Sequence, residues 1–584
     1  MKIYAFDPML GRVPLNRITI DVANEPLKPG PAGSRVRVID YDGANDCFYE
    51  PVDLDDRSIL MQGGLDPSES DPQFHQQMVY AVTIKVLENF ERALGRKVSF
   101  RGRRPLRMFP HAFQGRNAFF DPKLHALLFG YFPADREDPG PNLPGQTVFT
   151  CLSHDIVAHE MTHALVHRLR PHFFNRTNRD VLAFHEGFSD IVAIFQHFSF
   201  PEILHDHIQR TRGDLRQSDA LIDLAAQFGY ATGSGMALRK AVSSPDPQLY
   251  ETLTEAHDRG SLLVAAVFDA FFVTYQRRIA DLVRIATGGT GKLPDGDLHP
   301  DLVNRIATEV SRTAQSILTM CIRAFEYLPP VDITFGDYLR ALVTADFELS
   351  PADEHGQRRA MIEAFRARGI YPDGVYSLAE ESLLYPPAEP LLPNFSSELL
   401  GNLALEEYVY SRIQPAEETE APDSGVEEEE GSPGINRVLA GHLNKFARAN
   451  AAKLGFDPKG KGPAVQGFHP SFRVNSYGQL LMELVAQFVQ EVKTDEDFGG
   501  MKVFAGATVV ASADGTIRYV IAKPFDETLG SQFAQEARNR KRRQRSLVEA
   551  CDREDPFLPW AGLEYEKMRI ATVNLAQLHG RLRR

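Results

Sequence analysis

The chain is poor in cysteine and lacks any long hydrophobic run. Its 584 residues include four cysteines, with no C-x-x-C pair among them. This usage argues against a disulfide-stapled secreted domain and predicts reduced thiols in an intracellular protein. The longest apolar run, SLLVAAVFDAFFV, is too short to cross a bilayer and carries Asp269. We therefore expect no membrane span.

Positive charge is in the minority. Lys and Arg number 64 against 78 Asp and Glu, a formal net charge of −14, which argues against non-specific binding to nucleic acid. The first residues lack the basic and apolar stretches that form a secretory signal. Together these features predict a cytoplasmic protein that binds neither nucleic acid nor a membrane, with signal-independent export left open.

The hydrophobic patterns divide the chain into four regions. Residues 1–75 are β-rich, with RVRVIDYD and SILMQ reading as strands. Residues 76–372 begin with a helix and two strands in GRNAFFDPKLHALLFGYF, and then become helical. The helical patterns lie at 154–170, 181–198, 218–228, 260–283, 301–326, 335–346 and 355–368. We expect an α+β core in which a β-rich lobe and a helical lobe enclose a cleft.

The remaining two regions differ in composition. Residues 373–434 form an extended region ending in an acidic linker, 414–434, that is poor in apolar residues. Residues 435–584 predict a small additional α+β domain, with helices at 435–456 and 476–493. The segment 500–525 predicts a β-hairpin that turns at Asp514-Gly515. The basic run 537–545 is interpreted as a solvated helix face, with a patch for nucleic acid or an acidic partner as the alternative.

One short segment suggests chemistry. The sequence His159-Glu160-x-x-His163 has the H-E-x-x-H pattern, which by frequency occurs by chance in about one such chain in 25 to 30. On a helix, residues four apart share a face, so the two imidazoles can bind one zinc ion. Glu160 then lies beside that ion, where a carboxylate can accept a proton from bound water. The alternative is a helix that merely contains two histidines.

A catalytic zinc site needs a third protein ligand. The segment AFHEGFSDIVAIF offers Glu186 for that position and Asp190 on the same helical face. A ligating histidine usually donates its other N–H to an outer carboxylate, a role that suits Asp190. The alternative, an exposed acidic pair, explains poorly why both lie among large apolar residues.

The two segments together resemble the gluzincin metallopeptidases, thermolysin-like enzymes in particular. GRNAFF, ALRKAVSSPDPQLY and EAHDRGSLLVAAVFDAF resemble further family segments in order and spacing, over about 75–370. The resemblance implies one zinc ion per chain and hydrolysis of peptide bonds, with a hydrophobic residue favoured after the scissile bond. It assigns zinc binding to His159, His163 and Glu186, catalysis to Glu160 and His257, ligand orientation to Asp190, and substrate binding to Asn117, Ala118, Arg239, Ile156 and Leu238.

The chain departs from the family pattern in four ways. Phe173 and Phe174 stand near the expected oxyanion-binding tyrosine, with His172 as a substitute or a surface residue. The calcium ligands are not reproduced: Asp155 matches one, but the next falls on His197, so calcium is not expected. No long pro-segment precedes the catalytic unit. Thr252 replaces the aspartate that orients the histidine, a task left to Glu255 or Asp258.

Two functions remain open at this stage. The leading hypothesis is a zinc-dependent endopeptidase that acts on a peptide or protein substrate. The alternative is a zinc-binding, weakly active or inactive peptidase-like scaffold that acts through a protein partner bound by residues 435–584. Aminopeptidase activity ranks third, because no G-x-M-E-N segment is present to anchor an α-amine.

Overall fold

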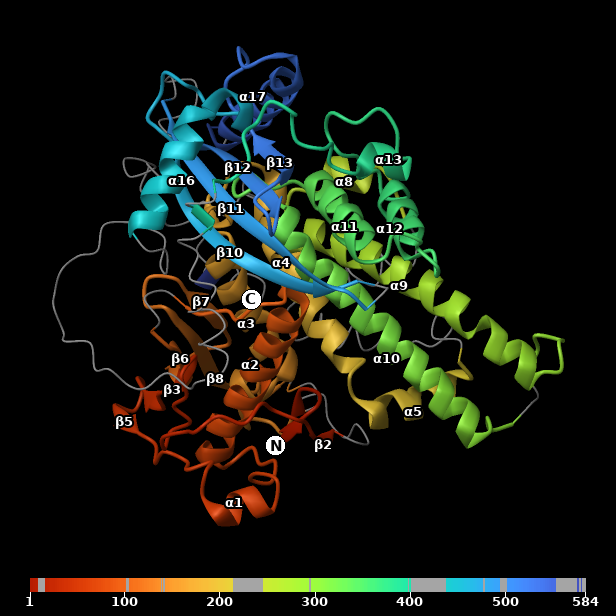
Figure 1. Ribbon diagram of the computed structural model, residues 1–584. Coiled ribbons are helices and arrows are strands. Elements are labelled where there is room, and N and C mark those ends of the chain that lie inside the picture. Colours follow the sequence, from red (N-terminus) through yellow and green to blue (C-terminus); the bar gives the residue numbers. More distant parts are fainter. Residues whose placement is uncertain are drawn as a thin grey trace.

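Figure 1 shows a computed structural model of the chain. The structure describes residues 1–8, 16–100, 104–137, 139, 142–213, 245–293, 296–396, 399–400, 437–475, 478–493, 502–552, 575–576 and 579. Helices and strands are mixed throughout, so the expected α+β class is confirmed. The predictions for 218–228 and for the acidic linker 414–434 lie outside the described residues.

The first 65 residues form short elements. These are β1 (Lys2–Tyr4), β2 (Arg17–Thr19), β3 (Val36–Val38), β4 (Tyr41–Asp42), β5 (Cys47–Phe48) and α1 (Arg57–Met61). The strand prediction for SILMQ is wrong, because this segment lies in α1. Asp56 caps that helix by accepting a hydrogen bond from the backbone N–H of Ser58, and such a cap favours a helix over a strand.

A five-stranded sheet follows, formed by β3, β6 (Leu106–Gln114), β7 (Ala118–Asp121), β8 (Ala126–Pro133) and β9 (Thr147–Phe149). Its order is β3-β6-β8-β7, with β9 also paired to β8. The two predicted strands of GRNAFFDPKLHALLFGYF are confirmed as antiparallel β7 and β8. β7 therefore lies at an edge of the sheet, where its outer side can accept another chain.

Helices make up most of the core. α2 (Pro72–Leu94) begins after Asp71, which caps it, and packs against α3. The others in this part are α3 (His154–Leu169), α4 (Arg179–His197), α5 (Pro201–Thr211), α8 (Leu249–Thr252), α9 (Ala256–Ala286), α10 (Pro300–Arg323), α11 (Phe335–Leu349), α12 (Gln357–Arg366) and α13 (Glu380–Leu383). Short 3₁₀ helices occupy η3 (Thr150–Leu152), η4 (Pro171–Phe174) and η5 (Ala324–Tyr327). Apart from 218–228, each predicted helix of this region is confirmed, within a few residues at its ends.

The last region contains a four-stranded antiparallel sheet in the order β10-β11-β12-β13. Its elements are α16 (Arg437–Ala449), η6 (Ala451–Leu454), β10 (Ala464–Val474), β11 (Leu480–Val492), β12 (Val503–Ser512), β13 (Ile517–Lys523) and α17 (Ser531–Asp552). The predicted hairpin is confirmed as β12 and β13. The helix predicted at 476–493 is wrong, because most of that segment is strand β11.

This sheet lies beside the helical core (Figure 1), and buried charges join the two. Glu483 on β11 accepts hydrogen bonds from Arg323, Tyr327 and Arg473, all buried. A second hydrophobic core, built from residues between 392 and 525, lies within the region of the sheet and α16. Val510 and Ile521 of the sheet belong to the main hydrophobic core, so the interface buries apolar surface beside the charged contact.

The basic run 537–545 lies in α17 and is only partly solvated. Arg540 is fully buried, and its Nε lies 3.1 Å from Oδ2 of Asp332. Arg543 lies 3.4 Å from the same oxygen. The interpretation as a solvated helix face is thus wrong for these two arginines, which fasten α17 to the core.

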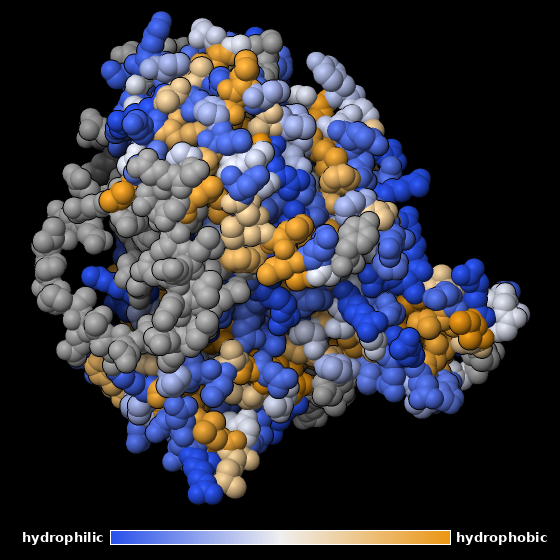
Figure 2. Space-filling model, viewed as in Figure 1, coloured by the Kyte–Doolittle hydropathy of each residue, from blue (hydrophilic) through white to orange (hydrophobic). Residues whose placement is uncertain are grey.

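Among the described residues, no helix is both long and apolar enough to span a bilayer. Figure 2 shows a face on which hydrophilic residues predominate and hydrophobic residues gather in several separate groups.

Candidate metal centre

The centre is built first on α3. Ser153 caps this helix, accepting a hydrogen bond from the N–H of Ile156, and α3 packs against α4 and β7. The helical period places His159 and His163 on one face, and both are buried, as is Glu160.

α4 supplies the carboxylates. Asn178 caps this helix, and Glu186 and Asp190 lie one turn apart within it, both buried. Glycines allow α9 to approach closely: a Cβ on Gly187 would lie 2.6 Å from the carbonyl oxygen of Gly260. This close packing brings the first turn of α9, with His257, up to Glu186.

Four side chains converge on a small buried space: His159, His163, Glu186 and His579. One ligand atom from each lies within 4.8 Å of all the others. The Nε2 atoms of His159, His163 and His579 lie 3.3, 3.7 and 3.5 Å from the oxygens of Glu186. Metal–ligand bonds of 2.0–2.1 Å in a tetrahedron imply ligand separations of about 3.3 Å. The three separations from Glu186 are therefore close to those between the ligands of a tetrahedral metal site.

Several of these atoms are polar, buried and without a hydrogen bond. They are Nε2 of His163, both oxygens of Glu186 and Nε2 of His579, none of which has a hydrogen-bond partner among the described residues. Buried polar atoms left in this way cost free energy. Since they face one another with the spacing of ligands, a cation held between them would satisfy them all.

Neighbouring groups hold the imidazoles. Nδ1 of His159 lies 2.9 Å from Oδ1 of Asp190, and Nδ1 of His163 lies 3.2 Å from Oγ of Ser189. Each histidine thus directs Nε2 toward Glu186. Burial would lower the pKa of His159, but Asp190 and Glu186 raise that pKa to about 9. Surroundings that favour a proton to this degree also favour a bound cation.

The surrounding imidazoles likewise affect Glu186. Burial would raise the pKa of its carboxyl, but His257 and His163 hold that pKa well below its usual value. Glu186 is therefore charged in the folded chain. Its Oε2 also lies 3.2 Å from Nε2 of His257.

His257 is held from its other side by Glu255. Nδ1 of His257 lies 3.1 Å from Oε1 of Glu255, which also caps α9 by accepting a hydrogen bond from the N–H of Asp258. Of the two residues expected to orient His257, the structure therefore brings Glu255 to it. Burial would lower the pKa of His257, but Glu186 and Glu255 raise it to about 9.

The side chain of Glu160 extends from α3 to β7. Its Oε2 accepts a hydrogen bond of 3.0 Å from the backbone N–H of Phe120 on β7. Its Oε1 lies 3.2 Å from Nδ1 of His579. The carboxylate is thus anchored through one oxygen and directed toward the ligand group with the other.

The two residues expected to hold substrate on the edge strand are in contact with another part of the chain. Nδ2 of Asn117 donates a hydrogen bond of 2.9 Å to the carbonyl of Ala576, and the carbonyl of Ala118 lies 3.0 Å from Nδ1 of His579. We call Leu575, Ala576 and His579 the late segment. Ile156 is buried on α3, while Leu238 and Arg239 lie outside the described residues.

Near the position where the family pattern has a tyrosine, the described residues include Phe173 and Phe174, whose side chains cannot donate a hydrogen bond. Phe174 packs against His167 and His185. His172 is half-buried, and its ring packs 4.6 Å from that of Phe504 on β12. Its role as a substitute for the tyrosine stays a prediction. Burial lowers the pKa of His172 to about 4.

Two further groups of histidines have the spacing of metal ligands. In one, His75 hydrogen-bonds His111 at 2.8 Å, and His111 contacts Asp40 at 2.6 Å. In the other, Asp155 and His197 form a close pair beside His154. Direct bonds use Nδ1 of His75, both nitrogens of His111 and Nε2 of His197, while both ring nitrogens of His154 have no hydrogen-bond partner among the described residues. Imidazoles are poor partners for calcium.

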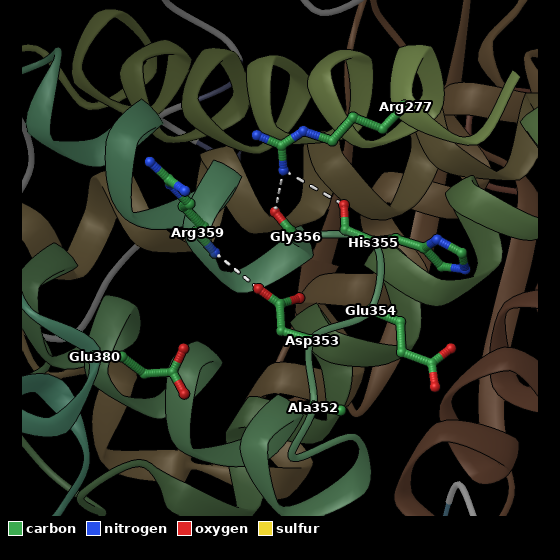
Figure 3. A pocket seen from close by; sticks show the side chains of 8 residues that line it. All are labelled: Arg277, Ala352, Asp353, Glu354, His355, Gly356, Arg359 and Glu380. Carbon is green, nitrogen blue, oxygen red and sulfur yellow. Dashed lines mark hydrogen bonds between the residues drawn. The ribbon is translucent and has the colours of Figure 1, made fainter. Parts of the chain in front are cut away.

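A polar cavity of ≈ 510 Å³ lies apart from the metal group (Figure 3). Arg277 donates to the carbonyl of Gly356 at its rim, and the N–H of Arg359 donates to Asp353. Its lining holds both signs of charge, includes the exposed His355, and shares no residue with the metal group. It is therefore a mixed-charge surface hollow.

No protein-family model and no curated protein matches the chain. The site is therefore interpreted from its own geometry. Among the four described residues of the ligand group, His579 is the one that the sequence analysis did not predict. That histidine stands alone in LAQLHGR, with no spacing pattern to mark it.

Proposed function

We propose that the chain is a zinc-dependent endopeptidase with a thermolysin-like, two-lobed core. One observation carries the proposal: His159, His163 and Glu186 converge with unsatisfied buried atoms, while Glu160 lies alongside them. A metal site with an adjacent carboxylate is what hydrolysis by an activated water requires.

The donor set favours zinc. Two imidazoles and one carboxylate are the ligands of many catalytic zinc sites, whereas calcium and magnesium prefer oxygen ligands alone. A zinc ion bound by His159, His163 and Glu186 would polarise both a water molecule and the carbonyl of a substrate.

Glu160 is the proposed general base. Its Oε2 is fixed by the N–H of Phe120, so Oε1 has a defined position from which to accept the proton of the attacking water. The same carboxylate can then pass that proton to the leaving amine. The hydrogen bond from Phe120 keeps the carboxylate beside the ligand group.

His257 is the proposed donor to the carbonyl oxygen, on which negative charge develops. Glu255 holds its ring and favours its protonated form. Because Phe174 cannot donate a hydrogen bond, His257 would stabilise the carbonyl oxygen without the tyrosine of the family pattern. Loss of one such donor costs about 10²–10³-fold in rate, so we expect a slow enzyme.

Substrate binding is proposed for the edge of β7. Asn117 and the carbonyl of Ala118 can pair with the main chain of an extended peptide, as strand addition does elsewhere. Ile156 is proposed to favour a hydrophobic residue after the scissile bond. Arg239 and Leu238 remain sequence predictions for the same task.

A second function is supported by the contact of His579 with Glu160 and Glu186. A chain whose own histidine fills the site could be a metal-binding scaffold without turnover, acting through residues 435–584. The two functions differ in whether any variant cleaves peptides.

The test is a mass-spectrometric cleavage profile on a mixed peptide library, with zinc content measured on the same samples. We expect one zinc per chain and cuts before hydrophobic residues. Glu160→Gln should bind zinc but cleave about 10²–10⁴-fold more slowly, while the exposed Glu251→Gln should behave as wild type. Absence of cleavage by both the wild type and His579→Ala, with zinc bound, would favour the scaffold.

A further inference from the structure

We propose that His579 is a fourth ligand of the metal and that the late segment fills the substrate cleft, so that the chain closes its own active site. The inference rests on the proposed function and concerns the regulation of the same site. Nothing in the sequence around His579 suggested it.

The surroundings of the imidazole determine which nitrogen faces the metal. Nδ1 of His579 lies 3.0 Å from the carbonyl oxygen of Ala118 and 3.2 Å from Oε1 of Glu160, both of which can only accept. A proton on Nδ1 satisfies these acceptors and leaves a lone pair on Nε2. That lone pair faces Glu186 at 3.5 Å, with no hydrogen-bond partner among the described residues. A ligating histidine commonly has this arrangement.

The number of ligands then distinguishes a closed site from an open one. Structural zinc sites have four protein ligands, whereas catalytic sites have three and keep the fourth position for water. His159, His163 and Glu186 provide three. His579 completes the four, and therefore occupies the position that an attacking water would need.

The late segment also takes the contacts that a substrate would use. Asn117 donates to the carbonyl of Ala576, and the carbonyl of Ala118 accepts from His579. Leu575 is buried in the main hydrophobic core, 2% exposed. The segment is thus held by a backbone contact, an apolar anchor and a ligand.

Glu160 is engaged by the same histidine. The side chain of His579 therefore takes the metal position of the attacking water, contacts the general base and binds a carbonyl of the edge strand. The closed form cannot hydrolyse a peptide until the segment leaves. A peptide on β7 and the late segment exclude each other, because both need Asn117 and Ala118.

The first measurement counts ligands without relying on activity. Co²⁺ is bound in place of zinc, and the visible absorption of wild type, His579→Ala and the exposed His355→Ala is recorded before and after azide. We expect azide to shift the spectrum of His579→Ala only, because only that variant has a position open to an outside ligand. Metal affinity of His579→Ala should fall about tenfold or more, since loss of even an outer partner costs 10–100-fold.

The second measurement is cleavage of the peptide library by the same three chains with zinc. His579→Ala should cleave at least about tenfold faster than wild type, and His355→Ala should not. If the alanine variant failed to fold, His579→Gln, which keeps much of the side-chain volume, would carry both measurements.

The outcomes separate the two proposals. Identical cobalt spectra, the same azide response and equal cleavage in wild type and His579→Ala would overturn the closure by His579 and leave the peptidase proposal standing. A changed cobalt spectrum with no cleavage by any chain would support the closure and contradict the peptidase.

Discussion

Glu255 performs two tasks at the start of α9. Its side chain caps the helix through the N–H of Asp258 and also holds Nδ1 of His257 at 3.1 Å. A residue that fixes another in this way acts on the reaction through orientation and charge. Its effect should therefore appear in turnover and leave substrate binding largely unchanged.

We expect Glu255→Gln to lower kcat about tenfold, with KM and metal affinity nearly unchanged, because a neutral amide supports a charged imidazole less well. The measurement is steady-state cleavage of one peptide in a chain that also carries His579→Ala. Asp258→Asn in the same background is the control, with less than about twofold expected. Equal losses in both variants would contradict the assignment of Glu255.

At this scale the sequence predicted most of the centre. His159 and His163 are four apart on one helix, and Glu186 and Asp190 repeat that spacing, so local geometry was enough to bring each pair to one face. Which of Glu255 and Asp258 holds His257 could be decided only from the structure, because it depends on how the first turn of α9 is oriented. His579 could not be predicted, because only the tertiary fold brings a lone histidine to residues over 300 positions earlier.

At the scale of elements, β11 shows why a pattern can mislead. It has a continuous run of buried residues, because one face packs on the core and the other is also covered. A strand buried on both faces loses the alternation of polar and apolar residues and resembles a buried helix. For the segment SILMQ the error is the reverse: a strand was predicted and a helix is found, because Asp56 caps the segment as a helix.

The join between α17 and the core depends on Asp332. Its Oδ1 accepts from Asn178, the cap of α4, and its Oδ2 lies near Arg540 and Arg543. Burial would raise the pKa of Asp332, but Arg540 and Arg543 lower it to about 2. One carboxylate therefore connects the start of α4 to α17.

This pKa predicts a stability that depends on pH. A carboxyl whose pKa is lower in the folded chain than in the unfolded chain stabilises above the unfolded value, near 4, and loses that contribution as pH falls toward 2. Linkage gives a loss of about 1 kcal/mol by pH 3. Unfolding in urea at pH 7 and pH 3 should show the gap between wild type and Asp332→Asn narrowing by that amount.

Asparagine suits this test because Asp332 has a φ of 54°, a left-handed conformation that Asn tolerates. Asp66→Asn, at an exposed pair with Lys2, serves as the control and should show a much smaller narrowing, because solvent screens that pair. A constant gap between wild type and Asp332→Asn at both pH values would contradict the role given to Asp332.

For the whole molecule, the feature that matters is the charged contact between the four-stranded sheet and the helical core. Glu483 binds Arg323 and Tyr327 from the core and Arg473 from its own sheet, all out of solvent. Separation of the two parts would break the hydrogen bonds from Arg323 and Tyr327 and expose the apolar surface that Val510 and Ile521 bury against the core. The sheet is therefore an integral part of the folded chain.

We expect Glu483→Gln to lower the free energy of unfolding by about 3–5 kcal/mol, because removal of one partner leaves a buried arginine without its counter-charge. Equilibrium unfolding in urea, followed by circular dichroism, measures this change. Glu491→Gln lies on the same strand, in a surface pair with Lys461, and should cost about 0–1 kcal/mol. Equal costs in both variants would show that the interface does not depend on Glu483.

The position of His579 in the chain also has a consequence for synthesis. The other three ligands and His257 have all left the ribosome once residue 257 has emerged. His579 follows roughly 320 residues later. At about 5–20 residues per second, this interval lasts tens of seconds. During that time the growing chain carries the proposed zinc ligands, Glu160 and His257 without His579, so the order of translation sets when the chain's own histidine can first cover the site.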